Sequence, residues 1–214
     1  MIFQLLIHEK EYYLSTTFKI KCVKSSFYDS ALLSEVCGKT IFNLNDCNLH
    51  EIEEVRKFRG KYGTCHILLT QFSYAAWKGG KENLAWRESA AIEKLNSVLN
   101  QSKILSAQYV IPFASFVRFS NSFNAYLNDS VNTPNSLIKF MKREDADLIF
   151  FRPMETQDIK DFSQNSDSLG FWMDKFKNIS YCPLIEYEKV ESVEELKGLL
   201  NAEEKMKETF EHFK

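Results

Sequence analysis

Residues that interrupt regular structure are scarce in this sequence, and long apolar runs are missing. Only 7 glycines and 4 prolines occur in 214 residues, so we expect packed helices and strands rather than long flexible loops. No apolar stretch reaches the ~18 residues that a membrane-spanning helix needs. The run from Met1 to Ile7 is too short for a secretory signal, and His8 follows it directly. We therefore expect no membrane span, and a cytoplasmic location.

An excess of charge of either sign is also lacking. The 27 Lys and Arg residues nearly balance the 29 Asp and Glu residues, which argues against a nucleic-acid binder or a polybasic membrane-surface protein. The 5 cysteines show no C-x-x-C spacing for zinc or disulfide exchange, so we expect reduced, mostly buried thiols. With 44% hydrophobic and 26% charged residues, the composition is that of a globular protein.

The first fifty residues are predicted to form a meander of strands. Residues 18–22 alternate apolar side chains with lysines, the pattern of a strand with one buried and one solvated face. Strands at 31–36 and 40–44 flank Gly38, which can adopt the positive φ of a tight hairpin turn. The short runs 3–7 and 12–14 are candidates for additional strands that could patch an edge of the sheet.

Beyond residue 45 the pattern alternates between helical and strand periods, which predicts an α/β layer architecture. Helices are expected at 52–58, at 82–105, from Thr133–Pro134 onward and around 171–176, with strands at 65–72, 109–113 and 148–151. A terminal helix is predicted by the capping box of Ser192 and Glu195. We divide the chain into a domain over 1–154 and a helical C-terminal extension over 155–214 that packs on it.

Familiar catalytic motifs are missing: the chain has no G-x-G-x-x-G, Walker loop, G-x-S-x-G or H-E-x-x-H. Its 4 histidines are isolated in sequence. The strongest local feature is Asn45–Asn48, which follows a predicted strand and precedes a helix, where α/β proteins gather ligands. Asp46 could bind a metal there. Alternatively, Asp46 or Asn48 caps a helix that begins near Leu49.

Two further segments follow predicted strands. The stretch Gln71–Gly80 could line a substrate pocket through Ser73, Tyr74 and Trp77, or could be a packed turn with aromatic cover. Polar amides, among them Asn121, trail the strand that ends near Phe113. By itself this is ordinary loop chemistry.

In this order, these segments resemble metallo-β-lactamase-fold proteins, and within them the metallo-hydrolase-like domain of CMP-N-acetylneuraminate hydroxylase and its bacterial relatives. The resemblance covers about residues 18–151. It rests on the segments Asp29–Leu33, Ile41–Asn48, Gln71–Gly80 and Tyr109–Phe116, with Lys78–Lys81 ahead of Trp86, Tyr126 and Asn132–Thr133.

The resemblance implies the C-terminal half of an αββα sandwich. The family's H-x-H-x-D-H cluster would lie upstream, so only Asp46 remains from the metal site, and one aspartate cannot hold a hydrolytic metal centre. Where relatives tend to have a histidine after the Pro-Phe-Ala segment, this chain has Asn121. An amide is a poor ligand for zinc or iron.

Two kinds of function remain open. The first is a hydrolase-like or oxygenase-like protein acting on a sugar nucleotide or related substrate, with Asp46 at the metal and Ser73, Tyr74, Trp77 and Asn121 in the pocket. It would bind zinc or iron only if a separate chain carrying the N-terminal half supplied histidines, and it would be inactive alone. The second is a non-catalytic half-sandwich that binds a partner or forms a homo-oligomer, or a truncated gene product. Its uncovered apolar face would have to be buried.

Overall fold

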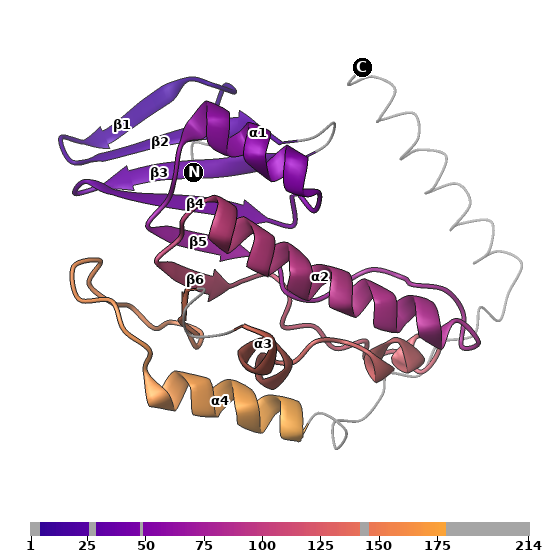
Figure 1. The fold of residues 1–214 in the computed structure, drawn as a ribbon. Coiled ribbons are helices and arrows are strands. Elements are labelled where there is room, and N and C mark those ends of the chain that lie inside the picture. The colour runs from indigo at the N-terminus through magenta and orange to yellow at the C-terminus, as the bar shows by residue number, and fades with distance from the viewer. Residues whose placement is uncertain (1–4, 26–28, 48, 142–145, 179–214) are drawn as a thin grey trace, which may run out of the picture.

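The computed structural model describes residues 5–25, 29–47, 49–141 and 146–178, which contain one mixed sheet with strands in the order β1-β2-β3-β4-β5-β6-β7 (Figure 1). The strands are β1 (Glu11–Ser15), β2 (Phe18–Lys24), β3 (Ser30–Val36), β4 (Lys39–Asn45), β5 (Ile67–Thr70), β6 (Tyr109–Pro112) and β7 (Asp147–Leu148). The helices are α1 (Ile52–Tyr62), α2 (Leu84–Ile104), the 3-10 helix η1 (Ala125–Asp129), α3 (Pro134–Phe140) and α4 (Ser166–Lys177). The predicted α/β class is therefore confirmed.

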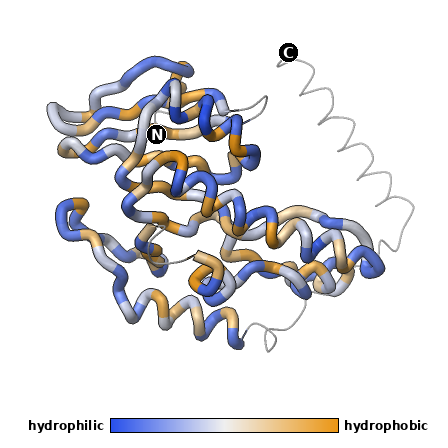
Figure 2. Tube along the Cα trace, in the orientation of Figure 1, coloured by the Kyte–Doolittle hydropathy of each residue, from blue (hydrophilic) through white to orange (hydrophobic). Residues whose placement is uncertain are grey.

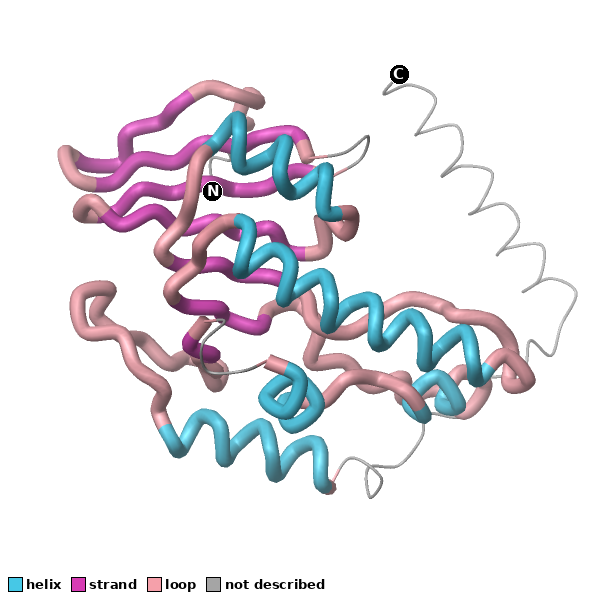
Figure 3. Tube along the Cα trace, in the orientation of Figure 1, coloured by secondary structure: helices cyan, strands magenta, loops and turns pink. Residues whose placement is uncertain are grey.

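Strands β1 to β4 form the predicted antiparallel meander. Cys37 and Gly38 join β3 to β4 with φ angles of 49° and 75°, the positive values of a two-residue hairpin turn. Strands β4 to β7 pair in parallel, with α1, α2 and α3 in the successive crossovers. Their carboxyl ends, and the loops that follow, therefore gather at one edge of the sheet (Figure 3).

One face of the sheet packs on helices. In Figure 1, α1 and α2 cross the near face, while α4 lies beyond the β6 edge. Phe42 of β4 meets Phe58 of α1 edge to face, with 5.8 Å between ring centroids. Leu68 of β5 and Val110 of β6 lie on the same side of the sheet as Phe42. Both are fully buried and belong to one core cluster with Val98 of α2. This face holds the main core, and hydrophobic residues recur along the strands that build it (Figure 2).

The opposite face carries two apolar rows, which together we call the open face. The first row runs through Ile20, Ser34, Ile41, Ile67 and Tyr109. The second runs through Cys22, Leu32, Asn43, Leu69 and Ile111. Apart from the buried Ile67, these side chains are half-buried, and none belongs to a cluster of buried core residues. Phe162 packs against the end of the first row, with 5.2 Å between its ring centroid and that of Tyr109.

Charged residues occupy the other side of the same strands. Lys19 pairs with Glu11 and Glu35, at 3.8 and 3.1 Å, and Lys21 pairs with Glu11 at 3.1 Å. These salt bridges lie on the helix side of the sheet, and together with Lys61 and Tyr62 of α1 their residues line a shallow pocket. The predicted solvated face of β2 is thus confirmed as this ion-pair ladder, whereas its apolar side belongs to the open face.

Three local predictions were wrong. The helix expected near Leu49 begins at Ile52, and its N-cap residue is Glu51, so Asp46 does not cap it. Cys47 and Leu49 instead form successive tight turns through backbone hydrogen bonds to Leu44 and Cys47. In the run predicted as strand 3–7, the described residues 5–7 are not in a strand. Asn48 and the Ser192–Glu195 box lie outside the described residues.

Helix α4 begins at Ser166, earlier than the predicted range 171–176, because the Asn165 side chain accepts a hydrogen bond from Asp167 N. The indole of Trp172 stacks on Phe116, with 3.8 Å between ring centroids, and donates to Phe151 O at 2.7 Å. The division of the chain at residue 155 stays a prediction. None of the described helices has the length and apolar character needed to cross a bilayer.

Candidate functional site

Polar and charged side chains meet at the carboxyl edge of β4 and β5. We define the carboxyl-edge cluster as Asp46, His50, Lys78, Lys94 and Ser97. Asp46 and His50 follow β4, Lys78 follows β5, and Lys94 and Ser97 lie on one face of α2. The charges of Asp46 and Lys78 both act on Lys94. Ligands of parallel α/β sheets bind at such edges, so this cluster is the first candidate for a site.

A buried hydrogen-bond chain fixes the loop that carries His50. Thr70, the last residue of β5, donates its hydroxyl to Gln101 Oε1 at 2.6 Å. Gln101 Nε2 then donates to Leu49 O at 2.8 Å. All of these groups are buried, so their hydrogen bonds are costly to break. These two hydrogen bonds connect β5, α2 and the loop after β4, and they place His50 against α2.

The hydrogen bonds of Ser97 assign the tautomer of His50. The Ser97 hydroxyl donates to Glu93 O at 2.9 Å, which uses its only hydrogen. Its oxygen therefore accepts from His50 Nδ1, 3.1 Å away. His50 Nε2 is left with a lone pair, and Lys94 Nζ lies 3.3 Å from it.

Burial lowers the pKa of both bases. For His50 burial is the largest cause, and the positive charges of Lys94 and Lys78 lower its pKa further. The pKa of Lys94 is also lowered mainly by burial, and by Lys78, against the opposing charges of Glu93, Asp46 and Asp29. The imidazole is therefore neutral at pH 7, and the amine loses its proton more readily than a solvated lysine.

The segment before α2 holds Lys78 in place. Gly79 has φ 79°, and a Cβ there would lie 2.5 Å from the side chain of Asn83, so only glycine fits. Tyr126 donates its hydroxyl to Gly79 O at 2.9 Å. Arg87 donates to Gly80 O at 2.6 Å. This glycine pair thus belongs to a packed turn, one of the two alternatives that the sequence left open for the segment.

The other sequence-predicted site residues are not gathered in the cluster. Ser73 and Tyr74 are buried: the Ser73 hydroxyl accepts from Asn132 N at 2.9 Å, and the Tyr74 hydroxyl donates to Leu127 O at 2.6 Å. Burial raises the pKa of Tyr74 to about 12. Trp77 is 63% exposed and meets Trp86 edge to face. Asn121 accepts from Phe123 N at 2.9 Å.

The donor set does not fit a metal ion. Asp46 is exposed and accepts a hydrogen bond from Asn45 Nδ2 at 2.8 Å. His50 follows Asp46 by four positions, and its Nε2 atom faces the amine of Lys94. His66 Nδ1 accepts from Thr40 N at 3.0 Å on the opposite edge. Across the described residues, no group of three or more His, Cys, Asp or Glu side chains could hold a metal. The described part of the chain therefore offers no ligand set of the kind that zinc or iron requires.

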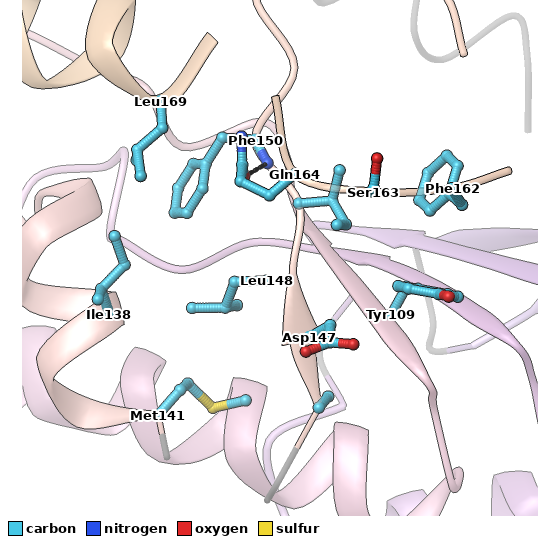
Figure 4. A pocket seen from close by; sticks show the side chains of 12 residues that line it. Tyr109, Ile138, Met141, Asp147, Leu148, Phe150, Phe162, Ser163, Gln164 and Leu169 are labelled. Atoms are coloured by element: carbon cyan, nitrogen blue, oxygen red, sulfur yellow. Dashed lines mark hydrogen bonds between the residues drawn. The ribbon is translucent and has the colours of Figure 1, made fainter. Parts of the chain in front are cut away.

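A pocket lies elsewhere, against the short strand β7 (Figure 4). Its volume is about 650 Å³. Ile138, Met141 and Leu148 point into it from α3 and β7, and Asp147 lies at its rim. The Gln164 side chain accepts a hydrogen bond from Phe150 N at 2.7 Å and closes one wall. None of the sequence-predicted site residues lines this pocket.

Sequence reasoning missed His50, Lys78 and Lys94. A signal was present: Lys94 and Ser97 are three residues apart on the predicted helix 82–105, and His50 follows Asp46 by four positions. What the sequence did not reveal is that the two segments face each other across the β4 edge.

Comparisons with known proteins assign no family. No protein-family description matches the sequence, and no curated protein matches it either. Among solved structures, the fold is similar to Igni18, described as a novel metallo hydrolase from the hyperthermophilic archaeon Ignicoccus hospitalis, with 15% sequence identity and a TM-score of 0.44. The match covers 73% of this chain and 60% of Igni18, so this chain corresponds to little more than half of that protein.

Proposed function

We propose that this chain is a partner-dependent binding module whose open face packs against a second β-layer supplied by another polypeptide. The observation that carries the proposal is the inverted distribution of side chains on β2 and β3. Ile20, Cys22 and Leu32 point to the face that none of the described helices covers, while Lys19 and Lys21 form the ion-pair ladder on the helix side. A strand with one solvated face normally buries its apolar face.

The parallel half of the sheet supports the same proposal. Parallel strands are found almost only where both faces are covered. Strands β4 to β6 carry Ile41 in the first row of the open face, and the register partners Leu69 and Ile111 in the second row. All three side chains are half-buried. A contiguous apolar surface of this kind marks an interaction site. A flat row of branched side chains suits a second sheet, which would pack about 10 Å away.

The partner is a separate chain, in keeping with the αββα sandwich that the sequence resemblance implies. Association between copies of this chain is the competing outcome. The two are distinguished by the molar mass of the purified chain over a range of concentrations, measured by light scattering.

Two neighbouring residues of β2 provide matched variants for the test. Ile20→Lys adds a charge to the open face, and Lys21→Gln changes the opposite face of the same strand. We expect Ile20→Lys to reduce binding of a hydrophobic dye and to abolish any association, with little change in melting temperature. Lys21→Gln is expected to change neither. If Ile20→Lys unfolds the chain while Lys21→Gln does not, the face is already covered within the monomer and the proposal fails.

A second candidate is the metal-dependent hydrolase acting on a sugar nucleotide, favoured by the exposed position of Asp46 after β4. The partner would have to supply every imidazole, and Trp77 and Asn121 would be the substrate contacts that remain accessible. Its test is the metal content of the assembled complex: zinc or iron bound by wild type and lost in Asp46→Asn supports it. A complex free of metal after incubation with either ion rejects it.

A further inference from the structure

The carboxyl-edge cluster contains a pair of basic side chains that the proposed function does not use. Lys94 Nζ and His50 Nε2 lie 3.3 Å apart in partly buried surroundings. Most buried lysines pair with a carboxylate, whereas among the described residues the side chain within hydrogen-bond distance of Lys94 Nζ is a neutral base. Because Ser97 fixes the His50 proton on Nδ1, the lone pair of Nε2 points at the amine.

We propose that Lys94 is a carbonyl-reactive amine, which forms an imine with a small aldehyde or ketone carrying an anionic group, and that His50 transfers the proton. A desolvated lysine beside another cation is the usual arrangement for such an amine. Lys94 satisfies both conditions, because it is half-buried and lies in the field of Lys78. Lys78 in turn supplies a positive charge for the anionic group of the ligand.

The charged groups around the amine come from four segments. Asp46 follows β4, Asp29 precedes β3, Lys78 precedes α2 and Glu93 belongs to α2 itself. The three carboxylates favour the protonated amine, whereas burial and Lys78 favour the neutral form, and burial is the largest cause. The pKa of Lys94 is consequently below that of a solvated lysine, which increases the nucleophilic fraction at neutral to mildly alkaline pH.

The reaction balances without an oxidant or a reductant. The Nζ lone pair attacks the carbonyl carbon, the C–N bond forms, and the π electrons move to oxygen. His50 Nε2 takes a proton from nitrogen and returns it to that oxygen. In the second step the nitrogen lone pair forms the C=N bond while the C–O bond breaks, and the remaining N–H proton passes through His50 to the departing oxygen. One water leaves, and His50 is unchanged.

The test uses pyridoxal 5′-phosphate, an aldehyde with an anionic group, followed by borohydride to fix the imine as a secondary amine. Peptide mass spectrometry then measures the labelling rate of each lysine in the full chain. We expect Lys94 to be labelled about tenfold faster than Lys57, which is exposed on α1. The variant His50→Gln is expected to slow Lys94 about tenfold, because the proton acceptor is lost.

Two controls keep the result specific. Lys57→Arg should leave the labelling of Lys94 unchanged, and Lys94→Arg should remove the fast site. Lys78→Gln should slow the reaction with pyridoxal 5′-phosphate but not with pyridoxal, which lacks the phosphate. The inference is overturned if Lys94 reacts no faster than Lys57, or if His50→Gln reacts like wild type at an unchanged melting temperature. Equal effects of Lys78→Gln on both aldehydes would overturn the role of the anionic group.

Discussion

The guanidinium of Arg87 holds the carboxylate of Asp129 through two parallel hydrogen bonds, from Nε to Oδ1 at 2.9 Å and from Nη2 to Oδ2 at 2.7 Å. Arg87 lies on α2 and is almost completely buried, while Asp129 closes η1. Arg87 also donates hydrogen bonds to the backbone carbonyls of Gly80 and Lys81. One side chain thus joins the turn before α2, the helix itself and the η1 segment.

The first prediction concerns this junction. Arg87→Lys keeps the charge but cannot form the paired hydrogen bonds, so carbonyls of the turn lose their donors. We expect the melting temperature to fall by ~5 °C or more, measured by circular dichroism. Arg56→Lys is the matched control, because Arg56 pairs with Glu53 on the exposed surface of α1. A change of the same size in both variants would contradict the structural role of Arg87.

The second prediction concerns the pH dependence of Asp129. The hydrogen bonds from Arg87 hold the pKa of Asp129 below its ordinary value. A lowered carboxyl pKa contributes stability above the unfolded value of ~3.9, and this contribution is lost as the pH falls through the folded value. Between pH 5 and pH 8, roughly, wild type should therefore exceed Asp129→Asn in free energy of unfolding by a constant amount. Below about pH 4 the difference should shrink. Urea titrations at several pH values measure it, and a difference that grows on acidification contradicts the assignment.

The third prediction concerns Asn132, whose amide Nδ2 donates to Phe72 O at 2.8 Å and to Ala91 O at 2.7 Å. Asn132→Asp replaces this donor with a carboxylate oxygen facing two buried carbonyls. We expect the free energy of unfolding to fall by about 2 kcal/mol or more. Asn135→Asp is the control, since Asn135 is exposed in the first turn of α3, where a carboxylate is tolerated. Equal stability of the two variants would show that the Asn132 amide is not needed.

The fourth prediction concerns thiol reactivity. Burial raises the pKa of Cys47 to about 11 and that of Cys65 to about 12, and both side chains are inaccessible. Cys37 lies exposed in the β3–β4 turn. At pH 8 we expect iodoacetamide to alkylate Cys37 in the folded chain and Cys47 and Cys65 only after unfolding. Peptide mass spectrometry follows each site, and rapid alkylation of Cys65 in the folded chain would contradict its burial.

The fold was largely predictable because its elements are local in origin. The hairpin at Gly38 and the helix start at Thr133–Pro134 follow from turn and cap chemistry within four residues, and both are present. The helical pattern at 52–58 predicted the start of α1 correctly. The alternative start near Leu49 was wrong, because the tertiary hydrogen bond from Gln101 to Leu49 holds residue 49 outside the helix. Side-chain hydrogen bonds over long sequence distances leave no periodic signal.

The candidate site was predictable only in part, for the same reason. Asp46 was found because it follows a strand directly, whereas Lys94 lies 48 positions further on and reaches the cluster only through the packing of α2. Ser73 and Tyr74 have the residue types of a pocket, yet their hydroxyls hold the loops after β5 and β6 together. Residue type and strand-end position do not distinguish a ligand contact from a scaffold contact.

The most direct test of the open face is the alkylation rate of Cys22, which lies in its second row opposite Leu32. The measurement is made on the folded chain at a concentration where light scattering gives a single copy, with the buried Cys65 as internal reference. The account predicts that Cys22 reacts before the chain unfolds, at least about tenfold faster than Cys65. Protection of Cys22 equal to that of Cys65 would mean that the chain already covers this face, and would contradict the proposal that a partner must do so.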